Sequence, residues 1–265
     1  MATINYTLKI ISNDLFIKYK SKERAYIDEK IVNFQTALKS CFGDKISDVL
    51  LFGSYKRDTI LPRRFDEKSD IDVLIIFNQS EKKFNTETYR NQIKQFAKIK
   101  YPRTPVVKDH PSVVLELQKI KFDLVPCRIY SGLLSDYYQI PDKNGYWMDT
   151  YPREFNKKLT NVNNQSGSIV KPLIRLFKCW NANQNYPFSS YELENIIADM
   201  SLSNKNLQSG FIYIIDNLPT NSLSQLGKQK IETLRNNGRW IKEYLNRDNQ
   251  EKAKEVVCRI LGVKI

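Results

Sequence analysis

The sequence predicts an α+β fold, in which a lobe built on a mixed β-sheet is followed by a helical lobe. Short apolar segments of strand length gather between residues 48 and 130, where they are interspersed with stretches of helical periodicity. From residue 168 onward the apolar residues recur at helical spacing. We therefore expect a sheet lobe at residues 1–160 and a helical lobe at residues 161–265.

The first expected element is a long amphipathic helix at residues 13–42. Asn13 is a suitable N-cap, and Gly43 follows as a C-terminal stop signal. The apolar stripe of this helix consists of Ile27, Ile31, Phe34 and Leu38. A helix of this kind would cover the back of the sheet.

An apolar run at residues 48–52 has the length and composition of a strand buried on both faces. It ends at Gly53 and Ser54. Glycine allows a tight turn and a close approach of a ligand to the main chain, and a helical turn from Tyr55 would direct unpaired N–H groups toward an anion. Because Ser54 adds a hydroxyl donor, this turn is a candidate phosphate-binding site.

A second strand is expected at residues 71–77, entered through two acidic residues. Since side chains alternate along a strand, Asp70 and Asp72 should lie on one face, while Ile71 and Val73 point into the core. Two carboxylates on one face repel each other unless a cation lies between them. Mg²⁺ is the natural candidate, because it binds carboxylates together with the phosphate oxygens of a substrate.

The next segments provide a third carboxylate. A helix is expected at residues 86–100, followed by a hairpin of residues 112–117 and 120–130. Asp123 lies inside the second apolar strand of this hairpin, where an unpaired charge would be costly. Beside the Asp70 and Asp72 strand, Asp123 would complete a metal site and help to deprotonate an attacking hydroxyl.

These motifs resemble those of the DNA polymerase β-type nucleotidyltransferases. The turn at Gly53-Ser54 is followed by Asp70-x-Asp72 and by Asp123 on a later strand. More narrowly, GSYKRDTILP followed by SDIDVLIIF resembles the bacterial cGAS/DncV-like nucleotidyltransferases (CD-NTase, SMODS-type), which make cyclic oligonucleotide signals in anti-phage defence (CBASS). One position departs from the pattern, because Asp58 stands where many relatives carry glycine.

The resemblance implies a metal-dependent transferase with its active site in the cleft between the two lobes. Asp70 and Asp72 would bind two Mg²⁺ ions, with Mn²⁺ as an alternative, and Asp123 would hold the ion that activates a ribose hydroxyl. Gly53 and Ser54 would position the triphosphate of the donor. The product would be a cyclic di- or trinucleotide that a downstream effector senses, with nucleic acid or an accessory protein as an activator.

The segment at residues 131–167 is tyrosine-rich and is expected to be irregular. Its pattern from Ile140-Pro141 through Gly145 and Trp147 to Thr150-Tyr151-Pro152 also resembles the family. The segment is interpreted either as a packed strap between the lobes or as a ligand contact.

The helical lobe supplies three further candidates. A helix from residue 168 places Lys171, Arg175 and Lys178 on a basic edge, which is either a solvated face or, by the resemblance, a triphosphate grip through Lys178. Ser189 or Ser190 would cap the next helix. The resemblance implies that Ser190 contacts the terminal phosphate and that Tyr191 stacks on the nucleobase. Three further helices are expected to follow.

Composition limits the other classes of function. The net charge of +13 suits an anionic partner or a solvated lysine-rich surface. The single histidine, His110, is expected in a surface loop, so histidine-based catalysis is excluded. No apolar run reaches membrane-spanning length and no signal peptide is evident, so a cytoplasmic protein is expected. The scattered cysteines are interpreted as small packing residues, namely Cys41, Cys127, Cys179 and Cys258.

Two alternatives remain open at this stage. One is another transferase on the same core, which makes linear oligoadenylate, extends tRNA ends or nucleotidylates small molecules. For a tRNA enzyme the Arg-Arg-x-Asp string is misplaced, because Arg63-Arg64-Phe65-Asp66 precedes the aspartate strand. The other alternative is a basic, non-catalytic nucleic-acid-binding module.

Overall fold

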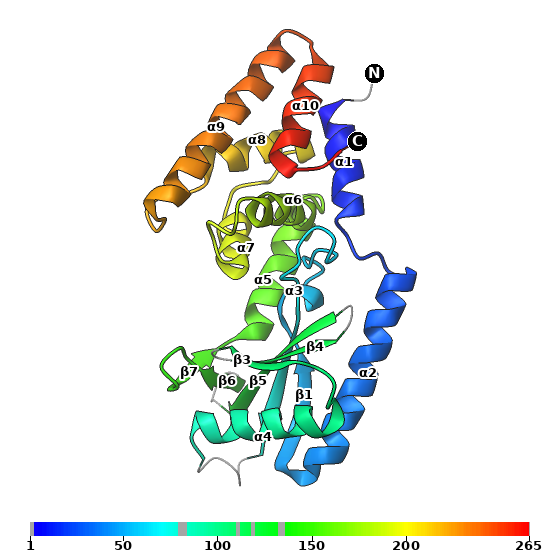
Figure 1. Ribbon diagram of the computed structural model, residues 1–265. Coiled ribbons are helices and arrows are strands. Elements are labelled where there is room, and N and C mark those ends of the chain that lie inside the picture. Colours follow the sequence, from blue (N-terminus) through cyan, green and yellow to red (C-terminus); the bar gives the residue numbers. More distant parts are fainter. Residues whose placement is uncertain (1–2, 79–83, 110–111, 118–119, 132–135, 265) are drawn as a thin grey trace. The chain divides into compact units, whose positions relative to one another are not determined.

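The computed structural model describes residues 3–78, 84–109, 112–117, 120–131 and 136–264 (Figure 1). The chain forms two compact units. The sheet unit comprises Lys18–Ile60 and Lys68–Asn156, and the helical unit comprises Met1–Ile17, Leu61–Glu67 and Lys157–Ile265.

This division departs from a single boundary at residues 160 and 161, because two earlier segments pack with the C-terminal helices. The first is the N-terminal helix, and the second is the short segment Leu61–Glu67. Within the helical unit the Arg64 guanidinium contacts Asp14 at 2.9 Å, and the buried Asp66 accepts a 2.6 Å hydrogen bond from Tyr186 Oη. Polar contacts over long sequence separations thus fix Leu61–Glu67 to the helices.

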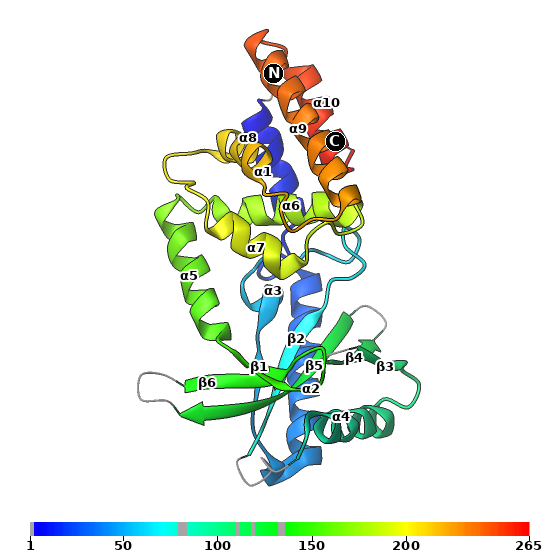
Figure 2. The ribbon, with the colours of Figure 1, turned by 90° about the vertical axis from the view of Figure 1, so that its left-hand side faces the viewer.

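The described strands of the sheet unit form a mixed sheet with the order β1-β2-β5-β4-β3 (Figure 2). The central strands β2 and β5 are parallel, and the other neighbouring pairs in this order are antiparallel. A further pair, β6 and β7, extends the far end of β5. The strands are β1 (Ile46–Leu51), β2 (Ile71–Phe77), β3 (Val106–Asp109), β4 (Ser112–Leu117), β5 (Ile120–Ser131), β6 (Asp136–Pro141) and β7 (Trp147–Thr150).

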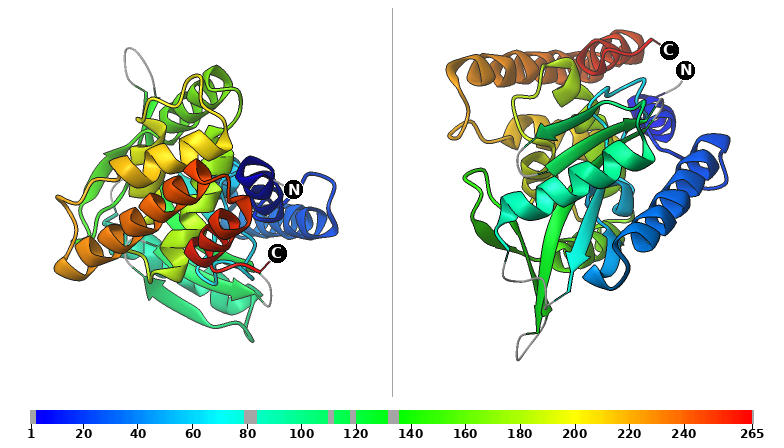
Figure 3. Two further views of the ribbon diagram at one scale, coloured as in Figure 1. Left: turned by 90° about the horizontal axis from the view of Figure 1, so that it is seen from above. Right: turned by 60° about the horizontal axis from the view of Figure 1, so that its bottom comes forward.

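Two helices, α2 (Lys22–Phe42) and α4 (Thr86–Lys100), pack on one face of this sheet (Figure 3). Phe34 of α2 stacks on Phe122 of β5, with ring centroids 4.8 Å apart, and meets Phe96 of α4 edge-on at 5.8 Å. Burial of these rings contributes apolar stabilisation to this core. Because Phe122 faces the helices, its neighbour Asp123 faces the other side of the sheet.

The predicted helix at residues 13–42 is wrong in its extent. The chain forms two helices, α1 (Ile4–Asp14) and α2, which are capped by the side chains of Thr3 and Ser21. The predicted stripe of α2 and its stop at Gly43 are confirmed. Apolar spacing continues through the connection, where Leu15 is fully buried, so periodicity alone does not reveal the break.

Two other expectations are corrected. The strand β1 is an edge strand with exposed residues at Ser47 and Asp48, so it is not buried on both faces. The segment expected to be irregular folds largely into β6, β7 and helix α5 (Pro152–Gln165). Asp142 organises the turn between these strands, because its side chain accepts hydrogen bonds from the main-chain N–H groups of Asn144 and Tyr146 at 2.8 Å.

Helix α6 is the centre of the helical unit. It packs against α1, α7, α8 and α10, and ten of its residues are buried. Helices α9 and α10 lie side by side as a hairpin (Figures 1 and 3). The helices after α5 are α6 (Val170–Asn183), α7 (Ser190–Ala198), α8 (Leu207–Asn217), α9 (Gln225–Asn246) and α10 (Gln250–Leu261). Among the described residues, none of the helices combines the length and apolarity that a bilayer crossing requires.

Candidate active site

The parallel pairing of β2 with β5 brings the predicted acidic residues together. Asp72 lies directly beside Asp123 in the register of the two strands, and Asp70 precedes β2 by one residue. Ile71 and Val73 are buried, as the alternation predicts. The sequence prediction that Asp123 lies beside the first aspartate strand is therefore confirmed.

A lysine that was not among the candidates predicted from the sequence forms ion pairs with two of these carboxylates. Lys121 Nζ lies 3.4 Å from Asp70 Oδ2 and 3.5 Å from Asp123 Oδ1. The three side chains are only 20–27% exposed, so this ammonium is a resident cation in a partly buried acidic cluster. The alternation Lys121-Phe122-Asp123 puts both polar side chains on one face, but it does not by itself show that they are in contact.

The charge balance of this cluster is visible in the lysine. Burial alone lowers the pKa of Lys121, whereas the carboxylates of Asp123 and Asp70 raise it, and the net shift is upward. The attraction between the ammonium and the carboxylates thus outweighs the loss of hydration. Lys121 stays charged at neutral pH.

Asp123 is also oriented from the neighbouring strand. Ser112 Oγ of β4 donates a hydrogen bond of 3.3 Å to Asp123 Oδ2. Since Val114 is the residue directly opposite Asp123, Ser112 is a diagonal neighbour on the same face. Asp123 is therefore held from two sides, by the hydroxyl of Ser112 and by the ammonium of Lys121.

The glycine turn contacts Asp72 directly. Gly53 begins the short helix α3 (Gly53–Lys56) with φ of +67°, and a Cβ at this position would lie 1.7 Å from Asp72 Oδ2. The buried main chain of Gly53 thus lies against the carboxylate, with Ser54 as the next, half-buried residue. Gly53 and Ser54 are therefore adjacent to the acidic cluster, as the motif requires.

The turn after Ser54 is closed by its own main chain. The Ser54 carbonyl accepts hydrogen bonds from the N–H groups of Thr59, at 3.0 Å, and Ile60, at 3.2 Å. Asp58 adopts the left-handed conformation with φ of +61° and contacts the guanidinium of Arg24 at 3.7 Å. This conformation explains why glycine suits this position and how aspartate is tolerated there.

Helix α2 anchors the same turn. The Arg24 guanidinium lies over the ring of Tyr55 at 4.1 Å, and Tyr55 Oη donates a 2.6 Å hydrogen bond to Asp28. Burial, together with this hydrogen bond to a carboxylate, raises the pKa of Tyr55 well above its usual value. The helix predicted to cover the sheet therefore also fixes the candidate phosphate-binding turn.

The donor set fits a hard divalent cation, although it is not a finished metal cage. Among the described residues, no three histidine, cysteine or acidic side chains are gathered as a metal-binding group. The ammonium of Lys121 instead lies between Asp70 and Asp123. Carboxylate oxygens are the ligands that Mg²⁺ prefers, and two of the three carboxylates already contact a cation, so Asp70, Asp72 and Asp123 are the residues that would hold the ion.

Lys178 is engaged inside the helical unit. Its ammonium donates a 3.1 Å hydrogen bond to Glu194 Oε1 of α7, and the two side chains are 5% and 1% exposed. Arg175 is buried as well, so the expected basic edge of α6 is not a solvated face. A contact between Lys178 and a phosphate would have to share or replace this ion pair.

Ser189, rather than Ser190, caps helix α7. Its hydroxyl accepts a 3.2 Å hydrogen bond from the N–H of Glu192. The start of the helix therefore does not account for Ser190, which is half-buried, or for Tyr191, whose side chain is 58% exposed. An exposed ring of this kind can stack on a base.

The motif around Trp147 is engaged in packing within the sheet unit. The Arg128 guanidinium lies 4.0 Å from the centroid of the Trp147 ring, and Tyr89 meets the same ring edge-on at 5.7 Å. Thr86 Oγ1 donates a hydrogen bond to the Gly145 carbonyl at 2.5 Å. These contacts all lie within the sheet unit, so the part of the segment around Trp147 packs on its own sheet.

Only some of the cysteines, which were expected to be small packing residues, are buried. Cys127 and Cys179 are buried packing residues as expected, whereas Cys41 is exposed and Cys258 is partly exposed. The expectation for His110 falls outside the described residues.

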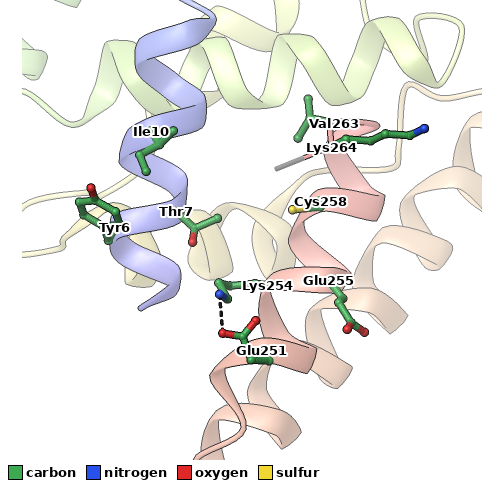
Figure 4. A pocket seen from close by; sticks show the side chains of 9 residues that line it. All are labelled: Tyr6, Thr7, Ile10, Glu251, Lys254, Glu255, Cys258, Val263 and Lys264. Atoms are coloured by element: carbon green, nitrogen blue, oxygen red, sulfur yellow. Dashed lines mark hydrogen bonds and ion pairs between the residues drawn. The ribbon is translucent and has the colours of Figure 1, made fainter. Parts of the chain in front are cut away.

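A surface pocket of about 480 Å³ lies in the helical unit (Figure 4). It lies between α1 and α10, and its lining includes Tyr6, Ile10 and Cys258. The ion pair of Lys254 with Glu251 is part of its lining. None of the candidate site residues lines this pocket.

The fold is that of the polymerase β-type nucleotidyltransferases. Solved structures with the same fold cover nearly the whole chain, and two of them are described next. CdnG of Bradyrhizobium diazoefficiens, solved with GTP, has a TM-score of 0.72 at 14% identity and covers 98% of this chain and 97% of its own. CdnC of Escherichia coli MS115-1, solved with ATP, has a TM-score of 0.65 at 16% identity and covers 97% of this chain and 95% of its own.

Residues 1–163 match the family model of the Second Messenger Oligonucleotide or Dinucleotide Synthetase domain, and the chain belongs to this SMODS family of CD-NTases. It is 30% identical over 186 residues to a Bacillus cereus protein named as a probable cyclic nucleotide synthase. It is 26% identical over 183 residues to the cyclic AMP-AMP-AMP synthase of an Acinetobacter species. These alignments cover 57% and 63% of this chain, and the chain spans about half the length of each relative, 55% and 50%.

Proposed function

We propose that this chain joins ribonucleoside triphosphates into a cyclic di- or trinucleotide second messenger, with release of pyrophosphate. The observation that carries the proposal is the register of Asp72 beside Asp123, with Gly53 against the Asp72 carboxylate. The names of the two relatives support a cyclic product. The structures of CdnG with GTP and of CdnC with ATP support triphosphate substrates.

In the proposed reaction, each residue has a distinct task. Asp70 and Asp72 would hold both Mg²⁺ or Mn²⁺ ions, and Asp123 would hold the ion beside the attacking ribose hydroxyl. The ions would neutralise phosphate charge and make this hydroxyl easier to deprotonate. The main chain of Gly53 and the hydroxyl of Ser54 would position the donor triphosphate.

The hydroxyl gives up its proton, with Asp123 as the proposed base, and its oxygen forms a bond to the α-phosphorus of the donor as the bond to pyrophosphate breaks. A second cycle on the linear intermediate closes the ring. From the helical unit, Lys178 and Ser190 are proposed to contact the triphosphate, and Tyr191 is proposed to stack on the base.

The biological setting is part of the proposal. The membership of this chain in the SMODS family supports a role in bacterial anti-phage signalling (CBASS), in which an effector would sense the product. One structural neighbour, CdnC, was also solved in complex with a HORMA protein, so an accessory protein is proposed as an activator here too. Because the proposed substrates are cytoplasmic metabolites, the cytoplasm is the proposed compartment.

Incubation with all four ribonucleoside triphosphates and Mg²⁺, followed by phosphatase and mass spectrometry, tests the proposal. A phosphatase-resistant cyclic product is expected. Linear chains would select the oligoadenylate alternative, and transfer to added tRNA or to a small molecule would select the other transferases. The double variant Asp70→Asn with Asp72→Asn should form no product while keeping its fold, and full activity in this variant would refute the site assignment.

A further inference from the structure

We propose that Lys121 is a built-in counter-ion of the acidic site, which occupies the metal position in the metal-free protein and must withdraw before a divalent cation binds. This inference rests on the proposed function, because it takes Asp70 and Asp123 as metal ligands. It assigns to Lys121 a positioning role that the acidic motif alone does not contain.

The ammonium of Lys121 lies between two of the acidic side chains. Lys121 Nζ contacts Asp70 Oδ2 and Asp123 Oδ1, at 3.4 and 3.5 Å, so it bridges the two carboxylates that an ion held by both would also bridge. A bound Mg²⁺ lies about 2.1 Å from its ligand oxygens and dehydrates reluctantly. The carboxylates cannot close to this distance around an ion while the ammonium stays between them.

The positive charge of Lys121 has opposite effects with and without a divalent cation. In the metal-free state the partly buried carboxylates repel one another, and Lys121 offsets this repulsion. When a divalent cation enters, the same ammonium becomes a like charge a few ångströms away. Lys121 therefore stabilises the carboxylates in the absence of metal and weakens metal binding.

A neighbouring carboxylate offers the ammonium of Lys121 a second position. The Lys121 side chain is 21% exposed and has a flexible four-carbon stem. In the antiparallel pairing of β4 with β5, Lys121 is directly opposite the exposed Glu116. Opposite residues share one face of the sheet, so the Glu116 carboxylate is the neighbour toward which Lys121 would move.

The test measures Mn²⁺ binding to the nucleotide-free protein by the electron paramagnetic resonance signal of free Mn²⁺. Lys121→Met should bind Mn²⁺ about tenfold more tightly than the wild type, because a like charge next to the ion is removed. Lys121→Arg keeps the charge and should bind as weakly as the wild type. Lys98→Met removes the same charge at an exposed position on α4. Because solvent and salt screen a surface charge, this control should change the Mn²⁺ affinity by less than about twofold.

Thermal unfolding in EDTA is the second readout. Lys121→Met should melt at a lower temperature than the wild type in EDTA and gain more from added Mn²⁺. If Lys121→Met fails to fold, Lys121→Gln serves in the same measurements. An unchanged or weaker Mn²⁺ affinity in the folded variants would overturn the inference.

Failure of this inference can be told apart from failure of the proposed function. If the wild type makes a cyclic product and Asp70→Asn with Asp72→Asn abolishes it, while Lys121→Met leaves Mn²⁺ affinity unchanged, then only the role of Lys121 is wrong. If neither the wild type nor Lys121→Met binds Mn²⁺ and no product forms with nucleotides, both proposals are wrong. Loss of tight binding when the two asparagine substitutions are added to Lys121→Met would support both.

Discussion

The main chain of Gly53 lies against the carboxylate of Asp72, so closely that a methyl group at Gly53 would come within 1.7 Å of Asp72 Oδ2. Gly53 also has φ of +67°, which side chains with a Cβ rarely adopt. The glycine of the motif is thus required both by the turn and by the position of the acidic side chain that it contacts.

We expect Gly53→Ala to displace Asp72 and to lower the rate of product formation by at least about a hundredfold, since small displacements of catalytic groups have effects of this size. Gly43→Ala is the matched control, because Gly43 also has a positive φ but has open space at its Cβ position. The control should lose about 1–3 kcal/mol of stability to backbone strain, because φ of 51° with ψ of −130° is a conformation that residues with a Cβ rarely adopt, and it should keep its activity. Equal activity of the two variants would contradict the role of the Gly53 contact.

The hydroxyl of Ser112 provides a second prediction. Ser112→Ala removes the 3.3 Å hydrogen bond to Asp123 Oδ2 and leaves the ion pair with Lys121 in place. The free energy of unfolding should fall by about 1–2 kcal/mol, as for a lost hydrogen bond to a charged group. Under the proposed function, product formation should fall with it while Asp123→Asn abolishes product altogether, and steady-state rates with urea unfolding curves check both expectations.

The left-handed conformation of Asp58 provides a third prediction. Asp58→Gly relieves the strain of φ at +61° but removes the 3.7 Å contact with Arg24, so stability should stay within about 1 kcal/mol of the wild type. Asp58→Ala removes the contact without relieving the strain, and it should be about 1 kcal/mol less stable than the glycine variant. Urea unfolding ranks the two variants, and an alanine variant as stable as the glycine variant would contradict the conformational argument.

The buried ion pair of Lys178 and Glu194 gives a fourth prediction. Lys178→Met leaves the carboxylate of Glu194, 1% exposed, without this cation and should cost about 3–5 kcal/mol of stability. Lys158→Met breaks the exposed pair with Asp199 in the same unit and should cost at most about 1 kcal/mol. Chemical denaturation distinguishes them. A destabilisation as small as that of the control would show that the Lys178 pair does not support the fold.

Thiol reactivity provides a fifth prediction. Burial raises the pKa of the Cys127 and Cys179 thiols to about 12, so both stay protonated near neutral pH, whereas Cys41 is exposed. At about pH 8, Ellman's reagent should react quickly with Cys41 and with Cys127 and Cys179 only after unfolding, because the thiolate is the reactive form. The Cys41→Ser variant should lose the fast phase. A fast phase that persists when the partly exposed Cys258 is also replaced by serine would contradict the burial of Cys127 and Cys179.

The pairing of the acidic residues was predictable from the sequence, because it depends on local patterns. Alternation along residues 71–77 put Asp70 and Asp72 on one face, and the hairpin of residues 112–130 carried Asp123 to the neighbouring strand. The ion pair of Lys121 was missed, since alternation shows which residues share a face but not which charges approach each other.

Other features depend on tertiary contacts that periodicity does not encode. The apolar pattern runs through the buried Leu15, so a helix was expected from residue 13, whereas α1 ends at Asp14 and α2 begins at Lys22. Lys178 has the spacing of a solvated edge, and its burial follows from Glu194, sixteen positions further along the chain. The tyrosine-rich segment after residue 131 pairs into strands because of the turn that Asp142 closes.

The most direct test of the central claim is anomalous scattering from crystals grown with Mn²⁺ and a non-hydrolysable ATP analogue. The account predicts manganese peaks among the carboxylates of Asp70, Asp72 and Asp123, with the triphosphate next to Gly53 and Ser54 and with Lys121 turned away. Manganese and triphosphate bound elsewhere, with Lys121 still between Asp70 and Asp123, would contradict it.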